Sequence, residues 1–333
     1  IPGDFEKFLS SHGGYSNANT NNEETNFFFT VQDDYFKKAL DRFAHFFISP
    51  GFYPDFVDRE INAVHSEYQK SLKNDGNRIY QVFKETANPK HPITKFGMGN
   101  RTTLQDSDGK SEQLYQDLLR FYQTHYSANM MKLVLLGIEP LDQLEQYLAK
   151  YFSKIVNKQL KTEKITEPLI NAKLPRLISV KPIKQVRRLK VMFKIPSQTP
   201  HLKYKPRQVI SSLIGDEGPG SLLSYLKSQG WVTGLTSGTG MKTHDHALYE
   251  IGIGLTKNGV NHVNDIMESM FSYINLIQAD QNRQRYYREM AKLAAVEFQF
   301  QEKTEPIWYV KKLASNLQLV DVEDVLTLPW AYE

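Results

Sequence analysis

The sequence contains no cysteine among its 333 residues. This absence excludes a disulfide scaffold, a thiolate zinc finger and a cysteine nucleophile. No apolar run approaches the roughly 18 residues that a membrane helix needs, so no membrane span is expected. An excess of one charge is also lacking, because 41 basic and 37 acidic residues give a net charge of +4. No long basic run stands out, and we therefore expect no nucleic-acid partner.

Apolar residues are plentiful, at 40% of the chain, and 12% of the residues are aromatic. This composition supports a sizeable core and argues against disorder as the main state. The length suggests two domains. Residues 158–176 are polar and contain prolines, so we expect a first domain at 1–157, a linker at 158–176 and a second domain at 177–333.

Apolar residues recur every three or four positions in many segments, which predicts amphipathic helices. These segments are 34–48, 55–74, 77–86, 111–125, 140–155, 204–215, 219–229, 259–278, 282–302 and 305–317. β-branched and aromatic runs predict extended segments between them. Those are 14–31, 132–136, 177–182, 187–195, 231–241 and 247–255.

The two halves of the chain repeat each other over a short motif. FLSSHG at 8–13 matches YLKSQG at 225–230, and each precedes an extended pair and then an amphipathic helix. About 45 residues lead into the second copy within its domain, but only seven precede the first. We therefore expect a fragment whose first domain lacks its opening strands and first helix.

Such a first domain should leave apolar side chains under-packed where the absent elements belong. The expected side chains are Phe27 and Phe29 on one strand face, together with Phe43, Phe46 and Phe47 on the following helix.

Two carboxylates at 60 and 67 are the main candidates for chemistry. Glu60 and Glu67 are seven residues apart, so at about 100° per residue they share one face and flank the apolar stripe. A half-buried carboxylate there needs a cation, a histidine or a metal as partner, whereas a solvated helix edge needs none. His65 points about 200° away from Glu67 and cannot bind the same metal from this helix.

The other motifs are weaker. His244 and His246 could share one strand face or lie in a surface turn. The glycine-rich stretch 215–221 lacks the lysine of a phosphate-binding loop, which favours a helix connection with Ser221 near a helix start. None of the nine histidines forms HxxH, HxxEH or HExxH, so a complete catalytic zinc site is not expected.

Five stretches together resemble one enzyme family. SHGGYSNANTNNEETNFFFTV, ALDRFAHFFISPGF, DREINAVHSEYQKSLKNDGNRIYQ, NPKHPITKFGMGN and LIGDEGPGSLLSYLKSQGWV are similar to the amino-terminal half of the insulysin and pitrilysin group of M16 zinc metallopeptidases. The resemblance implies an α+β fold of two duplicated domains, each an antiparallel-rich sheet packed by helices. Full members have four such domains around a chamber, which implies a missing carboxy-terminal half or a partner subunit that closes it.

The resemblance also implies a zinc-dependent endopeptidase that hydrolyses peptides and small proteins. The family's HxxEH motif lies just upstream of the stretch that resembles the start of this chain. Glu67 matches the third zinc ligand, and Glu60 matches an acidic residue that supports the site. The two histidines and the general base are absent, so we expect the chain as given to be inactive. A non-catalytic peptide-binding or assembly subunit on the same fold is the alternative.

The resemblance further implies where substrate binds. Residues Tyr15, Ser16, Asn17, Ala18 and Asn19 match an edge strand that pairs with an extended peptide. The stretch 234–240 matches the region that receives the substrate's amino terminus, with contributions from Leu235 and Ser237. A bacterial member would be periplasmic, and a cytoplasmic location is the alternative.

Overall fold

The computed structural model describes residues 3–106 and 108–333, which form two compact units. Unit 1 comprises Ile1–Glu85, Pro92–Lys164 and Lys303–Asp321. Unit 2 comprises Thr86–His91, Ile165–Glu302 and Val322–Glu333. These units do not coincide with the sequence-based division at 157 and 177, because a short loop at 86–91 joins unit 2 and a late helix joins unit 1. No helix in the described ranges is both long and apolar enough to cross a membrane.

Unit 1 is built around a two-stranded antiparallel sheet. Strand β1 (Tyr15–Thr20) pairs with β2 (Thr25–Thr30), and helices α1 (Asp4–Ser11) and α2 (Phe36–Ile48) pack on it. The ring of Phe29 lies 5.6 Å from that of Phe5 in α1 and 4.9 Å from that of Phe43 in α2. The expected under-packing is therefore wrong for Phe43, which is 7% exposed, because α1 and α2 supply the aromatic partners. Phe46 alone of this set stays exposed, at 41%.

The opposite face of β2 is covered by a helix that lies far along the chain. Helix α12 (Pro306–Asn316) carries Trp308, whose ring lies 6.0 Å from that of Phe28. The buried side chain of Asn26 donates to Lys311 O at 3.3 Å and to Ser315 Oγ at 3.2 Å. Alternate residues of β2 thus face two different helix layers, which explains why this strand is aromatic on both faces.

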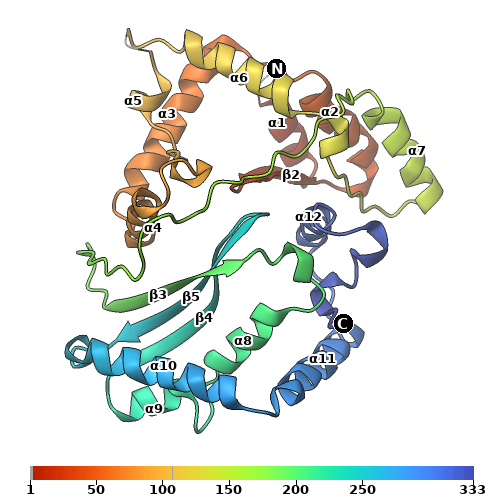
Figure 1. Cartoon of the computed structure of the whole chain (residues 1–333). Helices are drawn as coiled ribbons and strands as arrows, with labels where there is room; N and C mark the ends of the chain where they lie inside the picture. The colour runs from red at the N-terminus through yellow and green to blue at the C-terminus, as the bar shows by residue number, and fades with distance from the viewer. Residues whose placement is uncertain (1–2, 107) are drawn as a thin grey trace. The chain divides into compact units, whose positions relative to one another are not determined.

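Five further helices complete unit 1 (Figure 1). They are α3 (Pro54–Ser71), α4 (Asp75–Thr86), α5 (Arg101–Leu104), α6 (Glu112–His125) and α7 (Leu141–Phe152). The strand predicted at 132–136 is wrong, since this segment is irregular. A run of β-forming residues makes a strand only where another strand can complete its hydrogen bonds, and in the described chain none pairs with this segment.

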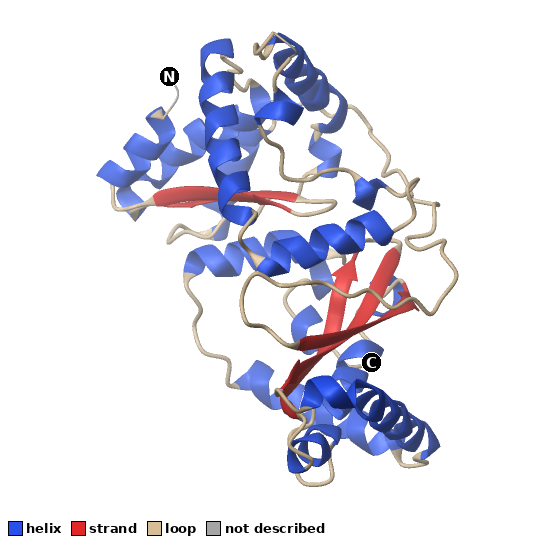
Figure 2. Cartoon of the chain, turned by 90° about the vertical axis from the view of Figure 1, so that its left-hand side faces the viewer, coloured by secondary structure: helices blue, strands red, loops and turns tan. Residues whose placement is uncertain are grey.

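Unit 2 contains a three-stranded antiparallel sheet with β5 in the middle. The strands are β3 (Arg188–Pro196), β4 (Val232–Lys242) and β5 (His246–Leu255), in the order β3-β5-β4. The helices of this unit are α8 (Pro206–Ile214), α9 (Leu222–Ser228), α10 (Val263–Ala279) and α11 (Arg283–Gln299). Helices α8, α9 and α10 lie on one side of the sheet (Figures 1 and 2). The strand predicted at 177–182 is wrong, because that segment is exposed and unpaired within the described sheet.

The repeated sequence motif corresponds to a repeated structure. Leu9 in α1 and Leu226 in α9 are both 0% exposed. Each helix is followed by a glycine in the left-handed region, Gly13 at φ 68° and Gly230 at φ 71°, where a side chain would be strained. The next residue then returns its N–H to the leucine carbonyl, at 2.8 Å in the first copy and 3.2 Å in the second. An antiparallel strand pair and a long helix follow in both units.

The loop at 86–91 is held within unit 2 by a buried asparagine. Asn88 is 2% exposed, and its backbone N–H donates to Leu169 O at 2.9 Å. Its side-chain amide donates to Pro168 O at 2.8 Å, and its Oδ1 accepts from Asn171 at 3.0 Å. The neighbouring His91 is 1% exposed, and its ring lies edge-on to that of His246 in β5, at 5.1 Å.

Substitution of the two equivalent leucines should destabilise the protein strongly. We expect Leu9→Ala and Leu226→Ala each to lower the free energy of unfolding by about 2–5 kcal/mol, because each leaves a cavity in a closed core. Urea denaturation of each variant measures this. Leu177→Ala is the control, since Leu177 is 90% exposed and its loss should change stability by less than about 0.5 kcal/mol. If either leucine variant were as stable as this control, the claim that the two leucines hold equivalent core positions would be wrong.

Stability should also fall in mild acid. Burial lowers the pKa of His91, and the nearby His246 lowers it further, while Glu167 acts in the opposite direction. The unfolded chain then takes up the proton more readily than the folded one, so stability is complete above the ordinary histidine pKa of about 6.5 and decreases below it. Urea denaturation at several pH values should show a shallower acid loss for His91→Gln than for His125→Gln, an exposed control. Identical profiles would exclude His91 as the cause.

Candidate functional site

Helix α3 presents the two candidate carboxylates. Val57 and Ile61 are its buried residues, at 8% and 2% exposure, and they anchor the apolar stripe predicted from the sequence. Glu60 and Glu67 are both exposed along one border of that stripe. Their shared face is thus confirmed, whereas the half-burial considered from the sequence is not found.

The other border of the stripe is fixed by polar contacts from α5 and the start of α6. The Arg101 guanidinium donates to Asn62 Oδ1 at 3.1 and 2.7 Å, and Ser111 donates to Asp58 at 2.8 Å. His65 lies on this same border, where its Nδ1 accepts from the Arg101 N–H at 3.4 Å. As predicted, His65 is therefore directed away from Glu67. These contacts set the rotation of α3, and they leave both carboxylates accessible.

The turn that follows the predicted peptide-binding strand β1 lies close to helix α4. Burial raises the pKa of the Tyr80 hydroxyl in α4. A side-chain hydrogen bond with Asn22 in the β1–β2 turn acts in the opposite direction and is the smaller of the two effects. The neighbouring Lys84 is 6% exposed, and burial lowers the pKa of its ammonium group. Lys84 donates to Lys95 O and its ammonium lies 5.8 Å from the centre of the Tyr80 ring. The sequence did not single out either residue.

Strand β1 has an open edge in the part of the chain that the structure describes, because β2 is its only partner there. Tyr15, Asn17 and Ala18 are exposed, and Ser16 and Asn19 are half-buried. The Ala18 N–H donates locally to Asn17 Oδ1 at 2.8 Å. The Asn19 side-chain oxygen is buried and has no hydrogen-bond partner among the described residues. A buried acceptor without a partner is unfavourable, so a hydrogen-bond donor supplied by a bound peptide would stabilise it.

The second predicted binding stretch lies on β4 in unit 2. The side chain of Leu235 is only 7% exposed and belongs to the core beneath the sheet, so any peptide contact there would come from its backbone. Ser237 Oγ is hydrogen-bonded to the hydroxyl of Tyr249 in β5. Strand β4 is an outer strand of its sheet. Its register against β5 shifts near each end, between Val232 and Gly234 and between Thr239 and Met241.

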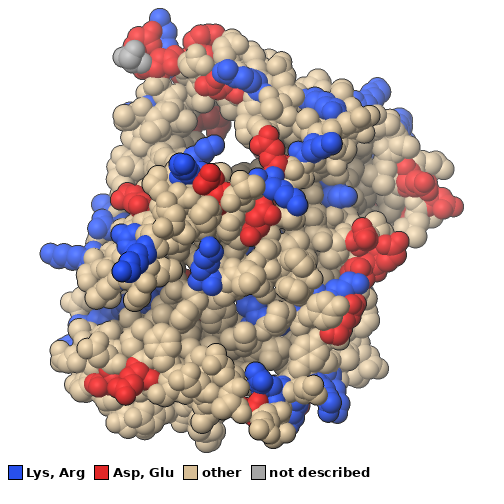
Figure 3. All heavy atoms as spheres, viewed as in Figure 1, with Lys and Arg blue, Asp and Glu red and all other residues tan. Residues whose placement is uncertain are grey.

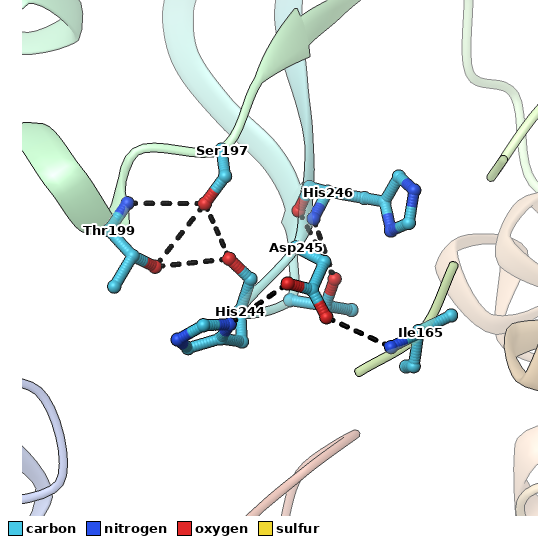
Figure 4. Close-up of polar contacts among 7 residues, drawn as sticks. Ile165, Ser197, Thr199, His244, Asp245 and His246 are labelled. Carbon is cyan, nitrogen blue, oxygen red and sulfur yellow. Dashed lines mark hydrogen bonds and ion pairs between the residues drawn. The ribbon is translucent and has the colours of Figure 1, made fainter. Parts of the chain in front are cut away.

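The two histidines at 244 and 246 do not form a pair. His244 lies in the turn between β4 and β5, whereas His246 is the first residue of β5, and their rings point in opposite directions (Figure 4). His244 Nδ1 lies 3.0 Å from Asp245 Oδ1, and the other carboxylate oxygen of Asp245 accepts from the Ile165 N–H at 3.0 Å. Ser197 and Thr199 both donate to the His244 carbonyl (Figure 4). The surface-turn interpretation is therefore confirmed for His244 only, since His246 is half-buried in β5 with its ring against that of His91.

The glycine-rich stretch 215–221 is a helix connection, as expected. Ser221 is the N-cap of α9, where its Oγ accepts from the Ser224 N–H at 3.1 Å. Asp216 turns back to accept from the Gly218 N–H at 2.9 Å. Both polar side chains are thus engaged in shaping the loop.

Two family models match the chain. The model described as "Insulinase (Peptidase family M16)" covers residues 2–90, and the one described as "Peptidase M16 inactive domain" covers residues 113–293. The chain belongs to peptidase family M16. The α+β architecture and the duplicated units agree with this membership.

Curated members of the M16 family match nearly the whole chain. "Insulin-degrading enzyme" from Bos taurus is 41% identical over 332 residues, which are 99% of this chain and 33% of that protein. "Nardilysin" from Rattus norvegicus is 38% identical over 331 residues, which are 97% of this chain and 28% of that protein. The chain thus spans about a third of the length of these M16 relatives.

Two solved structures have a similar fold. "Crystal Structure of pitrilysin" aligns with a TM-score of 0.88 and 30% identity, covering 98% of this chain and 35% of that one. A protease from Helicobacter pylori aligns with a TM-score of 0.67 and 18% identity, which supports the fold alone.

The residues present do not complete a zinc site for an M16 enzyme. Across residues 3–106 and 108–333, no group of three or more His, Cys, Asp or Glu side chains is arranged to hold a metal ion. Glu67 offers one accessible carboxylate, but a catalytic zinc needs three protein ligands. We therefore assign no reaction step to this chain by itself.

The chain should accordingly bind zinc only weakly. We expect less than stoichiometric zinc after dialysis of the 1–333 protein, because one exposed carboxylate competes poorly with water. Atomic absorption measures the metal content, and cleavage of a fluorogenic peptide with and without chelator measures activity. Stoichiometric zinc or chelator-sensitive cleavage would show that the chain completes a site unaided.

Proposed function

We propose that this chain forms the amino-terminal part of a zinc-dependent endopeptidase of peptides and small proteins. Glu67 would be a zinc ligand, and Glu60 would hold a ligand histidine in position by hydrogen bonding. The observation that carries the proposal is the placement of both carboxylates on one exposed border of α3. Among the described residues, neither carboxylate forms an ion pair or a hydrogen bond, so both are available to groups supplied from outside.

Zinc in such a site would activate water and polarise the peptide carbonyl. The two histidines and the general base would come from an HxxEH motif in a longer protein. The relatives named above are about 3 and 3.5 times as long as the present chain, which supports a longer full protein.

The binding of substrate would rest on backbone pairing. An extended peptide could add to the open edge of β1, where main-chain hydrogen bonds give affinity with little side-chain specificity. The Asn19 oxygen would then gain a donor, and the Asn17 side chain would have to release the Ala18 N–H. Strand β4 offers a second outer edge in unit 2, with Leu235 contributing its backbone.

A non-catalytic peptide-binding subunit is the second candidate. The family model over residues 113–293 is described as an inactive domain, which favours a binding role for that part of the chain. The two candidates differ in whether HxxEH precedes this stretch in the full protein.

Two substitutions in the full protein test the roles of the carboxylates. Glu67→Gln should lose zinc, because a neutral amide is a much poorer ligand. Glu60→Gln should retain more metal but reduce turnover by about 10–100-fold, as is typical when a group that orients a ligand is removed. Zinc content by atomic absorption and peptide turnover are measured side by side.

Glu145→Gln is the matched control, because Glu145 is an exposed glutamate on α7 of the same unit. It should retain both zinc and turnover. Equal zinc retention in the Glu60 and Glu67 variants would contradict the assignment. Full zinc with no activity in the unmodified protein would favour the binding subunit.

A further inference from the structure

The net charge of +4 conceals a strong local imbalance. Residues 168–215 include no aspartate or glutamate, but they include 11 lysines and arginines. Within this stretch, residues 173–194 carry eight of these cations, and we call them the basic segment. The overall composition hides it, because the rest of the chain has an excess of acidic residues.

The basic segment is also exposed and partly apolar. Residues 173–187 form neither helix nor strand, and the segment then continues into the outer strand β3. Six aliphatic side chains between 174 and 186 are at least 36% exposed, with Leu177 at 90% and Leu174 at 53%. Cations and aliphatic groups are therefore interleaved on one accessible stretch.

Few of these cations are neutralised within the protein. Lys190 pairs with Glu250 at 2.9 Å, and the Arg188 guanidinium donates to the Thr236 hydroxyl at 3.4 Å. In the described part of the chain, no carboxylate lies within 4.0 Å of Lys173, Lys181 or Arg187. Blue side chains gather over the loop that leads into β3, on the left of the face in Figure 3.

The composition of the basic segment distinguishes among anionic partners. Single-stranded nucleic acids bind through aromatic stacking as well as charge, but the basic segment contains one aromatic residue, Phe193, which packs against the core of unit 2. An acidic peptide would engage the cations but leave the aliphatic side chains in water. An anionic bilayer engages both, since lysine and arginine reach the headgroups while aliphatic groups enter the interfacial layer.

We propose that the basic segment binds the surface of anionic lipid membranes. This binding is peripheral and reversible, and it is independent of zinc and of peptide hydrolysis. Each cation near an anionic surface contributes roughly fivefold to affinity, and the contribution is screened by salt. Unit 2 would be the unit that meets the membrane.

Vesicle cosedimentation with the 1–333 chain tests this directly. We expect binding to phosphatidylcholine vesicles that contain about a third phosphatidylserine, and little binding without it. The triple variant Lys173→Gln, Lys181→Gln and Arg187→Gln should bind at least about tenfold more weakly. The control removes the same charge from exposed sites elsewhere, through Lys73→Gln, Lys257→Gln and Lys292→Gln, and should bind almost normally.

A second variant separates a membrane from other polyanions. Leu174→Gln with Leu177→Gln keeps every charge, so it should weaken vesicle binding severalfold while leaving binding to polyglutamate unchanged. Circular dichroism confirms that each variant is folded. Equal losses in the test and control triple variants would overturn the proposal. So would binding to polyglutamate or single-stranded DNA as tight as to vesicles, together with no effect of the leucine changes.

Discussion

Each unit depends on a leucine that is fully buried between a short helix and the strand pair that follows it. Leu9 and Leu226 occupy equivalent places, and a glycine with positive φ then lets the chain reverse into the sheet. The leucine carbonyl accepts the N–H that starts this reversal, so packing and backbone hydrogen bonding act at the same residue. The strands β1 and β4, on which peptide binding is proposed, begin directly after these turns.

Much of the fold could be predicted, because the helices carry regular apolar stripes and β4–β5 and β1–β2 are local pairs. The errors share a cause. Segments 132–136 and 177–182 have the composition of strands, but a strand forms only where a partner is present. The assignment of 86–91 to unit 2 depends on Asn88, which bonds a residue 80 positions away. Sequence periodicity contains no information about such contacts.

The candidate site was likewise only partly predictable from the sequence. Helical geometry alone placed Glu60 and Glu67 on one face, but only the family resemblance gave them roles. The burial of the Leu235 side chain could not be predicted from an alternating pattern of apolar and polar residues along β4, because the register of this strand shifts near both ends. The basic segment escaped notice for another reason, since its cations are spaced singly and the net charge averages them with distant acidic residues.

The central claim is that α3 supplies a zinc ligand to a site completed by a longer protein. A crystal structure of that protein with zinc bound tests it most directly, with the ion located by anomalous scattering at the zinc edge. The account predicts a Glu67 carboxylate oxygen about 2.0–2.2 Å from zinc, beside two histidines, with Glu60 outside the coordination sphere. A zinc ion held without Glu67, while that side chain remains in solvent, would contradict it.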